Sequence, residues 1–237
     1  MLIIYTLIGS CIASHAIVVF ERLARAEDFI AAPSRCQNCQ ALISWHDMLP
    51  IISFIWLRGR CRHCHAPIPA LLFSSELTGG LLGTLLYSLN LPLANQFSFG
   101  ILLFFVGIAT LQDSQKQEFD LNLFLAPATI GIFRIISYPP DIIIFLFGII
   151  VSLILGWLVA RKQLGLGDLL FYLIIGFNSD FLIANRVLLI ASGIVILQNF
   201  QLLICTKTHL KTRIAFLPAL YFGLIATIII EVMTKQF

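Results

Sequence analysis

Residues 141–160 read DIIIFLFGIIVSLILGWLVA, and this stretch decides the fold class. After Asp141 it holds no charged side chain, and a helix of about 20 apolar residues crosses the hydrocarbon core of a bilayer. The whole chain is also strongly apolar, with 59% hydrophobic residues, 11% charged residues and a mean hydropathy of +0.96. A soluble domain is about half apolar and about a quarter charged. The sequence therefore predicts an all-α polytopic membrane protein.

Eight apolar segments are candidate transmembrane helices, for which about 20 residues is the usual length. They are 2–20, 71–90, 97–112, 121–137, 141–160, 166–180, 183–204 and 214–233. The segment 166–180 is the weakest candidate, because it is short and has Gly167 and Asp168 near its start. The first segment has no basic region before it and no small-residue cleavage site after it, so we expect a retained helix rather than a signal peptide.

A polar stretch over residues 21–70 separates the first two apolar segments. It contains arginines, histidines, prolines and four of the six cysteines. Such a stretch is expected to fold as a small module of its own. We therefore predict three parts: a first transmembrane helix over 1–20, a four-cysteine module over 21–70 and a transmembrane core over 71–237.

Basic residues indicate how the helices are oriented. If the module faces the cytoplasm and the helices alternate, twelve of the fifteen Lys and Arg residues are cytoplasmic, and only Arg134, Arg186 and Lys235 lie outside. Loops rich in Lys and Arg favour the cytoplasmic side. This topology places both termini outside. The net charge of +3 is too small to indicate a nucleic-acid partner.

The cysteines of the module form two CxxC pairs. Cys36-Gln-Asn-Cys39 is followed after 21 residues by Cys61-Arg-His-Cys64. Two such pairs bring four thiolates into a tetrahedron, which is the geometry of a structural zinc site. The reducing cytoplasm disfavours disulfides.

Other interpretations of the cysteines stay open. The two pairs could be redox or disulfide pairs without a metal. Three histidines could replace a cysteine as ligands, and they are His46, His63 and His65. Cys11 and Cys205 have no partner at a suitable spacing, and we expect them to be apolar helix residues.

Two aspartates stand where predicted helices meet the cytoplasm. Asp113 ends the third helix, where a carboxylate faces the unfavourable end of the helix dipole. Asp168 opens the sixth helix within Gly165-Leu166-Gly167-Asp168. Two carboxylates that share a proton can hydrolyse a peptide, since one takes a proton from water while the other polarises the carbonyl. The two glycines let an extended peptide approach the backbone.

Each aspartate also has an interpretation without catalysis. Asp168 could cap a helix N-terminus, and Asp113 could mark the boundary with water. Asp120 and Glu118 are expected to support the same loop or to lie among headgroups. The remaining four aspartates are interpreted as solvated charges, and they are Asp28, Asp47, Asp141 and Asp180.

Several motifs occur in order along the first three quarters of the chain. They are Gly9-Ser10, the cysteine pairs, SWHDMLP at 44–50, RGRCRHC at 58–64, ELTG at 76–79, Asp113 with Asp120, and GLGD at 165–168. Together they resemble the type IV prepilin peptidases, polytopic GxGD aspartic proteases that include the competence-pilin peptidases. The resemblance implies that Asp113 and Asp168 are catalytic.

The resemblance also implies a substrate and a location. The expected substrate is a pilin or pseudopilin precursor with a basic leader, a glycine and an apolar helix, cut after the glycine on the cytoplasmic side of a bacterial inner membrane. Many family members then methylate the new N-terminus with S-adenosylmethionine. We further hypothesise that Glu118, Asp120 and Glu76 attract the basic leader.

The chain departs from the family pattern at three places. Phe119 replaces the proline before Asp120, and Leu169-Leu170 replaces a small residue and a lysine after GxGD. Residues 70–73 lack the usual Arg-Tyr-Pro, near the region linked to methyl transfer. The departure at 70–73 weakens the expectation of methylation more than that of cleavage.

Two other functions are alternatives. One is a non-enzymatic membrane scaffold whose zinc module docks a partner in a pilus, secretion or DNA-uptake machine. The other is an intramembrane aspartyl protease of the presenilin type, which we rank last because Gln112-Asp113 lacks that family's tyrosine.

Overall fold

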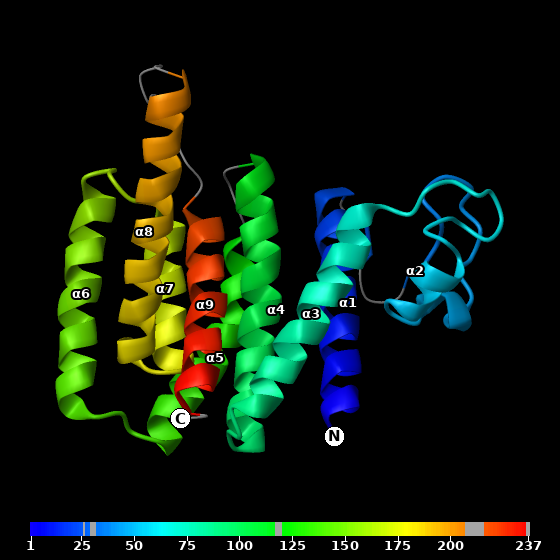
Figure 1. The fold of residues 1–237 in the computed structure, drawn as a ribbon. Helices are drawn as coiled ribbons and strands as arrows, with labels where there is room; N and C mark the ends of the chain where they lie inside the picture. Colours follow the sequence, from blue (N-terminus) through cyan, green and yellow to red (C-terminus); the bar gives the residue numbers. More distant parts are fainter. Residues whose placement is uncertain (26, 29–31, 117–119, 207–215, 236–237) are drawn as a thin grey trace. The chain divides into compact units, whose positions relative to one another are not determined.

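The computed structural model describes residues 1–25, 27–28, 32–116, 120–206 and 216–235 (Figure 1). Over these residues the chain is helical, and strand-like pairing is limited to two isolated bridges. The helices are α1 (Leu2–Arg25), η1 (Trp45–Met48), α2 (Ile52–Trp56), α3 (Ala70–Ser88), α4 (Leu93–Lys116), η2 (Leu121–Phe124), α5 (Leu125–Ser137), α6 (Ile142–Ala160), α7 (Leu166–Asn178), α8 (Phe181–Thr206) and α9 (Leu217–Lys235).

Among the described residues, six helices are long and apolar enough to cross a membrane. These six correspond to predicted segments and are α1, α3, α4, α6, α8 and α9. The other two predicted segments form shorter apolar helices, Leu121–Ser137 and Leu166–Asn178. The all-α membrane fold is confirmed, whereas a full crossing by the two shorter helices stays a prediction.

The chain divides into two compact units, Met1–Asn90 (unit 1) and Leu91–Phe237 (unit 2). Unit 1 contains α1, the polar module and α3, and unit 2 contains α4 to α9. The boundary lies at residue 90 rather than at the end of the module, because α3 packs along α1. Both candidate catalytic aspartates therefore belong to unit 2.

Glycines let α1 and α3 approach closely inside unit 1. A Cβ atom at Gly79 would overlap the carbonyl of Gly9, and one at Gly83 would overlap the carbonyl of Tyr5. Small residues at helix contacts are typical of membrane proteins, because lipid provides no hydrophobic force that brings two helices together. The Gly9-Ser10 motif therefore has a packing role at this contact.

Glu76 joins α1, α3 and the module. Its carboxylate oxygens accept hydrogen bonds from Ser14 Oγ at 2.9 Å and from the backbone N–H of Ile51 at 2.7 Å. Its backbone carbonyl accepts from Ser10 Oγ at 2.8 Å. Ile51 has a φ of +64°, which is costly for a β-branched residue. The bond to Glu76 therefore holds this backbone at the N-cap of α2, within the module.

In unit 2 a buried amide ties three helices together. Asn178, the last residue of α7, accepts from Ser98 Oγ of α4 at 2.9 Å. Its side-chain nitrogen donates to the carbonyls of Pro127 in α5 at 2.8 Å and of Ile174 at 2.9 Å. Because hydrogen-bond partners are scarce in lipid, such a bonded cluster fixes the register of its helices.

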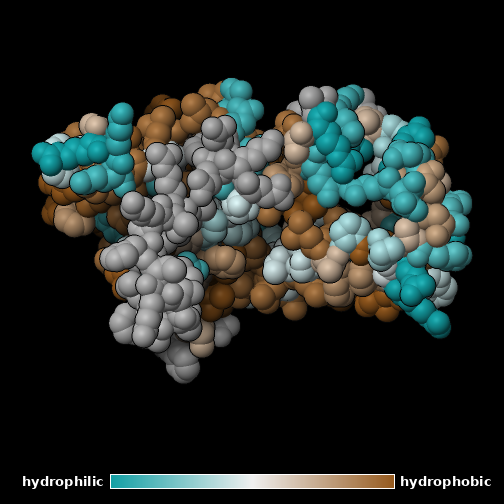
Figure 2. Space-filling model, turned by 90° about the horizontal axis from the view of Figure 1, so that it is seen from above, coloured by the Kyte–Doolittle hydropathy of each residue, from teal (hydrophilic) through white to brown (hydrophobic). Residues whose placement is uncertain are grey.

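The surfaces of α6 and of the module differ in polarity. Helix α6 lies at the edge of unit 2 (Figure 1) and exposes apolar side chains such as Ile143, Phe147 and Leu153. At its end, the Arg161 guanidinium lies 4.1 Å from the ring centre of Trp157, a pair suited to the membrane interface. Hydrophilic residues gather instead over the module of unit 1 (Figure 2).

The close contact of α1 and α3 predicts the effect of Gly83→Val. The added side chain must push the helices apart, so we expect a loss of about 1–3 kcal/mol in unfolding free energy. Gly193→Val is the matched control, because a Cβ atom at this position in α8 meets nothing within 4 Å. Denaturation in detergent, followed by circular dichroism, measures both variants. Equal stability of the two would contradict the packing role of Gly83.

Candidate functional site

The four cysteines of the module form one cluster. The sulfur atoms of Cys36, Cys39, Cys61 and Cys64 all lie within 4.8 Å of one another, and the thiols are free. Sγ of Cys36 and Sγ of Cys64 are 3.8 Å apart. Zinc about 2.3 Å from each of four sulfurs in a tetrahedron separates them by about 3.8 Å. The cluster therefore fits a structural zinc ion, and no histidine among the described residues joins it.

The two cysteine pairs are copies of one local structure, which the sequence analysis missed. Residues 35–42 read RCQNCQAL and residues 60–67 read RCRHCHAP. Each segment closes with one antiparallel bridge. The residue after the second cysteine has positive φ in both copies, +57° at Gln40 and +58° at His65. The similarity of these two octapeptides, 25 residues apart in the sequence, could have predicted that the segments fold alike.

Hydrogen-bond donors beside Cys64 favour its thiolate form. The backbone N–H of Ala66 and the side-chain amide of Asn38 lower the pKa of the Cys64 thiol to about 6. The distance from Asn38 Nδ2 to Cys64 Sγ is 3.6 Å. A thiolate, and not a thiol, is the form that binds a metal. The local structure thus prepares Cys64 for zinc at neutral pH.

Asp47 is paired rather than solvated, so its sequence interpretation is wrong. Arg62 Nε donates to Asp47 Oδ2 at 2.8 Å, and the guanidinium also donates to Asp47 Oδ1 at 2.6 Å. Ser44 Oγ donates to the same carboxylate at 3.0 Å. The guanidinium lowers the pKa of Asp47. This pair ties the second cysteine segment to η1.

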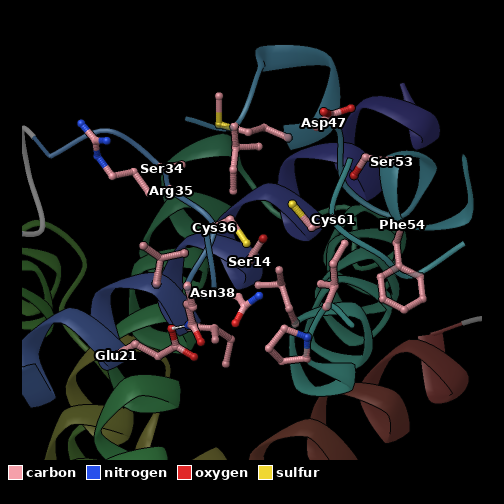
Figure 3. Close-up of a pocket in the computed structure, with 18 of the residues that line it drawn as sticks. Ser14, Glu21, Ser34, Arg35, Cys36, Asn38, Asp47, Ser53, Phe54 and Cys61 are labelled. Atoms are coloured by element: carbon pink, nitrogen blue, oxygen red, sulfur yellow. Dashed lines mark hydrogen bonds between the residues drawn. The ribbon is translucent and has the colours of Figure 1, made fainter. Parts of the chain in front are cut away.

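A pocket of about 840 Å³ lies inside unit 1, between α1, the module and α3. Figure 3 shows Ser14 and Glu21 from α1, Arg35, Cys36 and Asn38 from the first cysteine segment, Cys61 from the second, and Ser53 with Phe54 from α2 around it. Small-molecule sites measure about 300–1,000 Å³ and combine apolar walls with a few polar groups. The pocket has both properties.

Asp113 and Asp168 come together in unit 2. They are 55 residues apart in the sequence, yet α4 and α7 pack against each other, and the two carboxyl groups lie close enough to interact electrostatically. Each aspartate is only 8% exposed. The backbone amide of Leu217, at the start of α9, interacts with Asp113. Oδ2 of Asp113 is buried and has no hydrogen-bond partner among the described residues.

Asp168 also caps its own helix. Its Oδ2 accepts from the backbone N–H of Gly165 at 3.2 Å, and its own N–H donates to the Gly165 carbonyl at 3.2 Å. A Cβ atom at Gly165 would lie 3.1 Å from Oδ2 of Asp168, so glycine keeps this carboxylate uncrowded. Gly167 is buried in the first turn of α7. Capping and catalysis are compatible here, because the cap occupies a single carboxylate oxygen.

The predicted supporting acids are not gathered around the pair. Asp120 is exposed and caps η2 by accepting from the N–H of Asn122 at 2.9 Å, while its own N–H donates to Gln112 Oε1 at 3.0 Å. Glu118 lies outside the described residues. Glu76 belongs to unit 1, where hydrogen bonds within the chain occupy both of its carboxylate oxygens.

Two more of the aspartates that the sequence analysis interpreted as solvated charges are Asp141 and Asp180. Asp141 caps α6, because its side chain accepts from the N–H of Ile143 at 2.8 Å. Oδ1 of Asp180 is buried and lacks a hydrogen-bond partner among the described residues. Asp180 as a whole is partly exposed, so its interpretation as a solvated charge stays a prediction.

Two buried carboxyl groups that interact electrostatically define what this site can do. Like charges held near each other cannot both ionise easily, so such a pair favours one ionised and one protonated member. One carboxylate can then act as a base toward water, and the protonated carboxyl can donate to a carbonyl oxygen. This arrangement suits hydrolysis of an amide bond.

Comparisons with known proteins place unit 1 in a family context. Residues 7–89 match the family described as the Bacterial Peptidase A24 N-terminal domain. A protein named prepilin leader peptidase/N-methyltransferase from Myxococcus xanthus is 35% identical over 75 residues, 32% of this chain and 22% of that protein. Proteins of the same name from Vibrio cholerae and Klebsiella pneumoniae are each 30% identical, over 104 and 103 residues.

These matches are partial on both sides. They cover 40% of this chain and 41% of the Vibrio protein, and 44% of this chain and 45% of the Klebsiella protein. No solved structure matches the chain significantly. The resemblance to the prepilin peptidases predicted from the motifs is confirmed. The family match ends at residue 89, before the aspartate pair.

The cysteine cluster predicts one bound zinc ion per chain, as measured by elemental analysis of the purified protein. Cys64→Ser should lose the ion and lower the melting temperature of the module, because structural zinc supplies folding free energy. Cys11→Ser is the control, since Cys11 lies on α1 outside the cluster. Full zinc occupancy in Cys64→Ser would overturn the four-cysteine site.

Proposed function

We propose that the chain is a type IV prepilin peptidase, an aspartic endopeptidase that removes the basic leader of pilin or pseudopilin precursors after a glycine. The observation that carries this proposal is that two buried carboxyl groups, Asp113 and Asp168, interact electrostatically at the ends of α4 and α7. A buried acid pair is costly in an apolar surrounding. Its presence inside unit 2 is explained by chemistry that needs both groups.

In the proposed reaction, one carboxylate of the pair takes a proton from water as the water oxygen bonds to the scissile carbonyl carbon. The protonated partner donates to the carbonyl oxygen. Collapse of the tetrahedral intermediate breaks the C–N bond, and the leaving nitrogen receives a proton from the pair. Gly165 has no side chain and is exposed next to Asp168, which leaves space for an extended peptide beside the acids.

The proposed location is a bacterial inner membrane with the aspartate pair and the zinc module on the cytoplasmic side and both termini outside. The distribution of Lys and Arg residues supports this orientation. It also suits the substrate, because the polar leader stays in the cytoplasm while the apolar helix of the precursor remains in lipid.

Cleavage of a synthetic prepilin by the detergent-solubilised protein tests the peptidase proposal. Asp113→Asn and Asp168→Asn should each lower the rate more than about 1,000-fold, because neither acid can replace the other in proton transfer. Asp141→Asn is the matched control, since asparagine can still cap α6.

Full processing by both aspartate variants would overturn the peptidase proposal. Combined with loss of function in Cys64→Ser, that outcome would favour the scaffold alternative, in which the module docks a partner and no bond is cut.

We propose a second activity, methyl transfer from S-adenosylmethionine, because the relatives' name includes N-methyltransferase. The pocket of unit 1 supports it by size and by lining. An acidic side chain, Glu21, and a basic one, Arg35, line the pocket and match the ammonium and carboxylate ends of this cofactor. The cofactor would supply the methyl group to the new N-terminal amine.

Calorimetry with S-adenosylhomocysteine tests the pocket without relying on turnover. One saturable site per chain is expected in the zinc-loaded protein. Ser53→Trp should weaken binding at least tenfold by filling the pocket, whereas Ser74→Trp, exposed on α3 and outside the pocket lining, should leave it unchanged. Equal binding by the two variants would place the ligand elsewhere.

A further inference from the structure

Thr110 lies one helical turn before Asp113 in α4 and has an unusual hydroxyl group. The residue is 9% exposed, and its Oγ1 is buried without a hydrogen-bond partner among the described residues. A buried hydroxyl without a partner costs about 1–3 kcal/mol. Oδ2 of Asp113 is buried and unpartnered in the same way.

Several other hydroxyl groups in the helices avoid this cost locally. They bond to a carbonyl three or four residues earlier in their own helix, as Thr84, Ser88, Ser114, Thr129 and Thr227 do. The best comparison is Thr227 of α9, which is 1% exposed and donates to the Gly223 carbonyl at 2.8 Å. This bond is the usual solution for threonine in a helix. Thr110 does not use it.

The two unpartnered groups are neighbours on α4. Residues three apart share one face of a helix, with Cβ atoms about 5–6 Å apart. One water molecule that makes two hydrogen bonds of about 2.8 Å bridges groups at this separation. Buried water typically binds polar groups that otherwise lack partners. Thr110 and Asp113 thus form a two-point polar site beside the aspartate pair.

We propose that Thr110 is a positioning residue of the peptidase site and holds the hydrolytic water against Oδ2 of Asp113. The inference rests on the proposed peptidase function and deepens it. Asp168 has a partner for its Oδ2 in Gly165, whereas Oδ2 of Asp113 has no hydrogen-bond partner among the described residues and can receive the water. The asymmetry assigns the two acids different roles.

Atoms and charges balance in the proposed step. The carboxylate of Asp113 takes one proton from the water, and the water oxygen forms a bond to the carbonyl carbon. Protonated Asp168 gives its proton to the carbonyl oxygen. On collapse the C–N bond breaks, the nitrogen takes the proton held by Asp113, and Asp168 recovers its proton from a hydroxyl of the intermediate. Thr110 exchanges no proton and only orients the water.

Steady-state cleavage by Thr110→Val and Thr110→Ser tests the proposal. Valine keeps the shape but removes the hydroxyl, so kcat should fall about 10- to 100-fold with KM unchanged, as expected for a misplaced reactant. Serine keeps the hydroxyl and should restore kcat to within about threefold of wild type. Thr227→Val is the control, and its kcat should stay within the same range.

Thermal unfolding separates positioning from packing. Because valine removes an unpartnered hydroxyl, Thr110→Val should be at least as stable as wild type. A wild-type kcat in Thr110→Val overturns the proposal, and so does a loss of stability that parallels the loss of activity. Retained cleavage in Asp113→Asn and Asp168→Asn instead overturns the peptidase function itself, so the two failures are distinguishable.

Discussion

Lipid as the solvent is the constraint on which this structure depends. Inside a bilayer no water is available to form hydrogen bonds with backbone or side-chain polar groups. The apolar segments that the structure describes are therefore helical, and their buried polar groups need hydrogen-bond partners within the protein. Glu76 meets this requirement with both carboxylate oxygens, and Asn178 meets it with carbonyls and Ser98. Against this background Oδ2 of Asp113 and Oγ1 of Thr110 stand out, because neither has a hydrogen-bond partner in the part of the chain that the structure describes.

The two units solve the problem of stability differently. The module of unit 1 is too polar to bury a large apolar core, and it is organised by the cysteine cluster, the Arg62–Asp47 pair and the anchor at Glu76. Small structural domains commonly rely on such a metal site. Unit 2 relies on helix packing, with the Asn178 cluster at one end of α7 and the acid at the other. Rigid helices are the elements that can hold two carboxyl groups at a fixed separation.

Much of the candidate site was predictable because its signals are local. CxxC spacing sets the direction of two sulfurs in one turn, and GxGD places an acid in the first turn of a helix. The roles of Glu76 and Asp47 were not predictable, because each depends on a hydrogen-bond partner that is distant in sequence. The proposed role of Thr110 was not predictable either, because it depends on the lack of a hydrogen-bond partner among the described residues. Asp47 meets Arg62 across 15 residues and Glu76 meets Ser14 across 62. Spacing carries no information about such contacts.

The sequence by itself determined the membrane class, the positions of the apolar helices, the four cysteines as one candidate metal site and the two aspartates as catalytic candidates, since hydropathy and short motifs act over a few residues. Only the tertiary structure decided that α3 belongs with α1 and that Asp113 and Asp168 are both buried and near enough to interact electrostatically. The physical reason is that helix pairing depends on which faces fit, here on glycines at 9, 79 and 83, and packing between distant segments leaves no periodic mark in a chain that is apolar almost throughout.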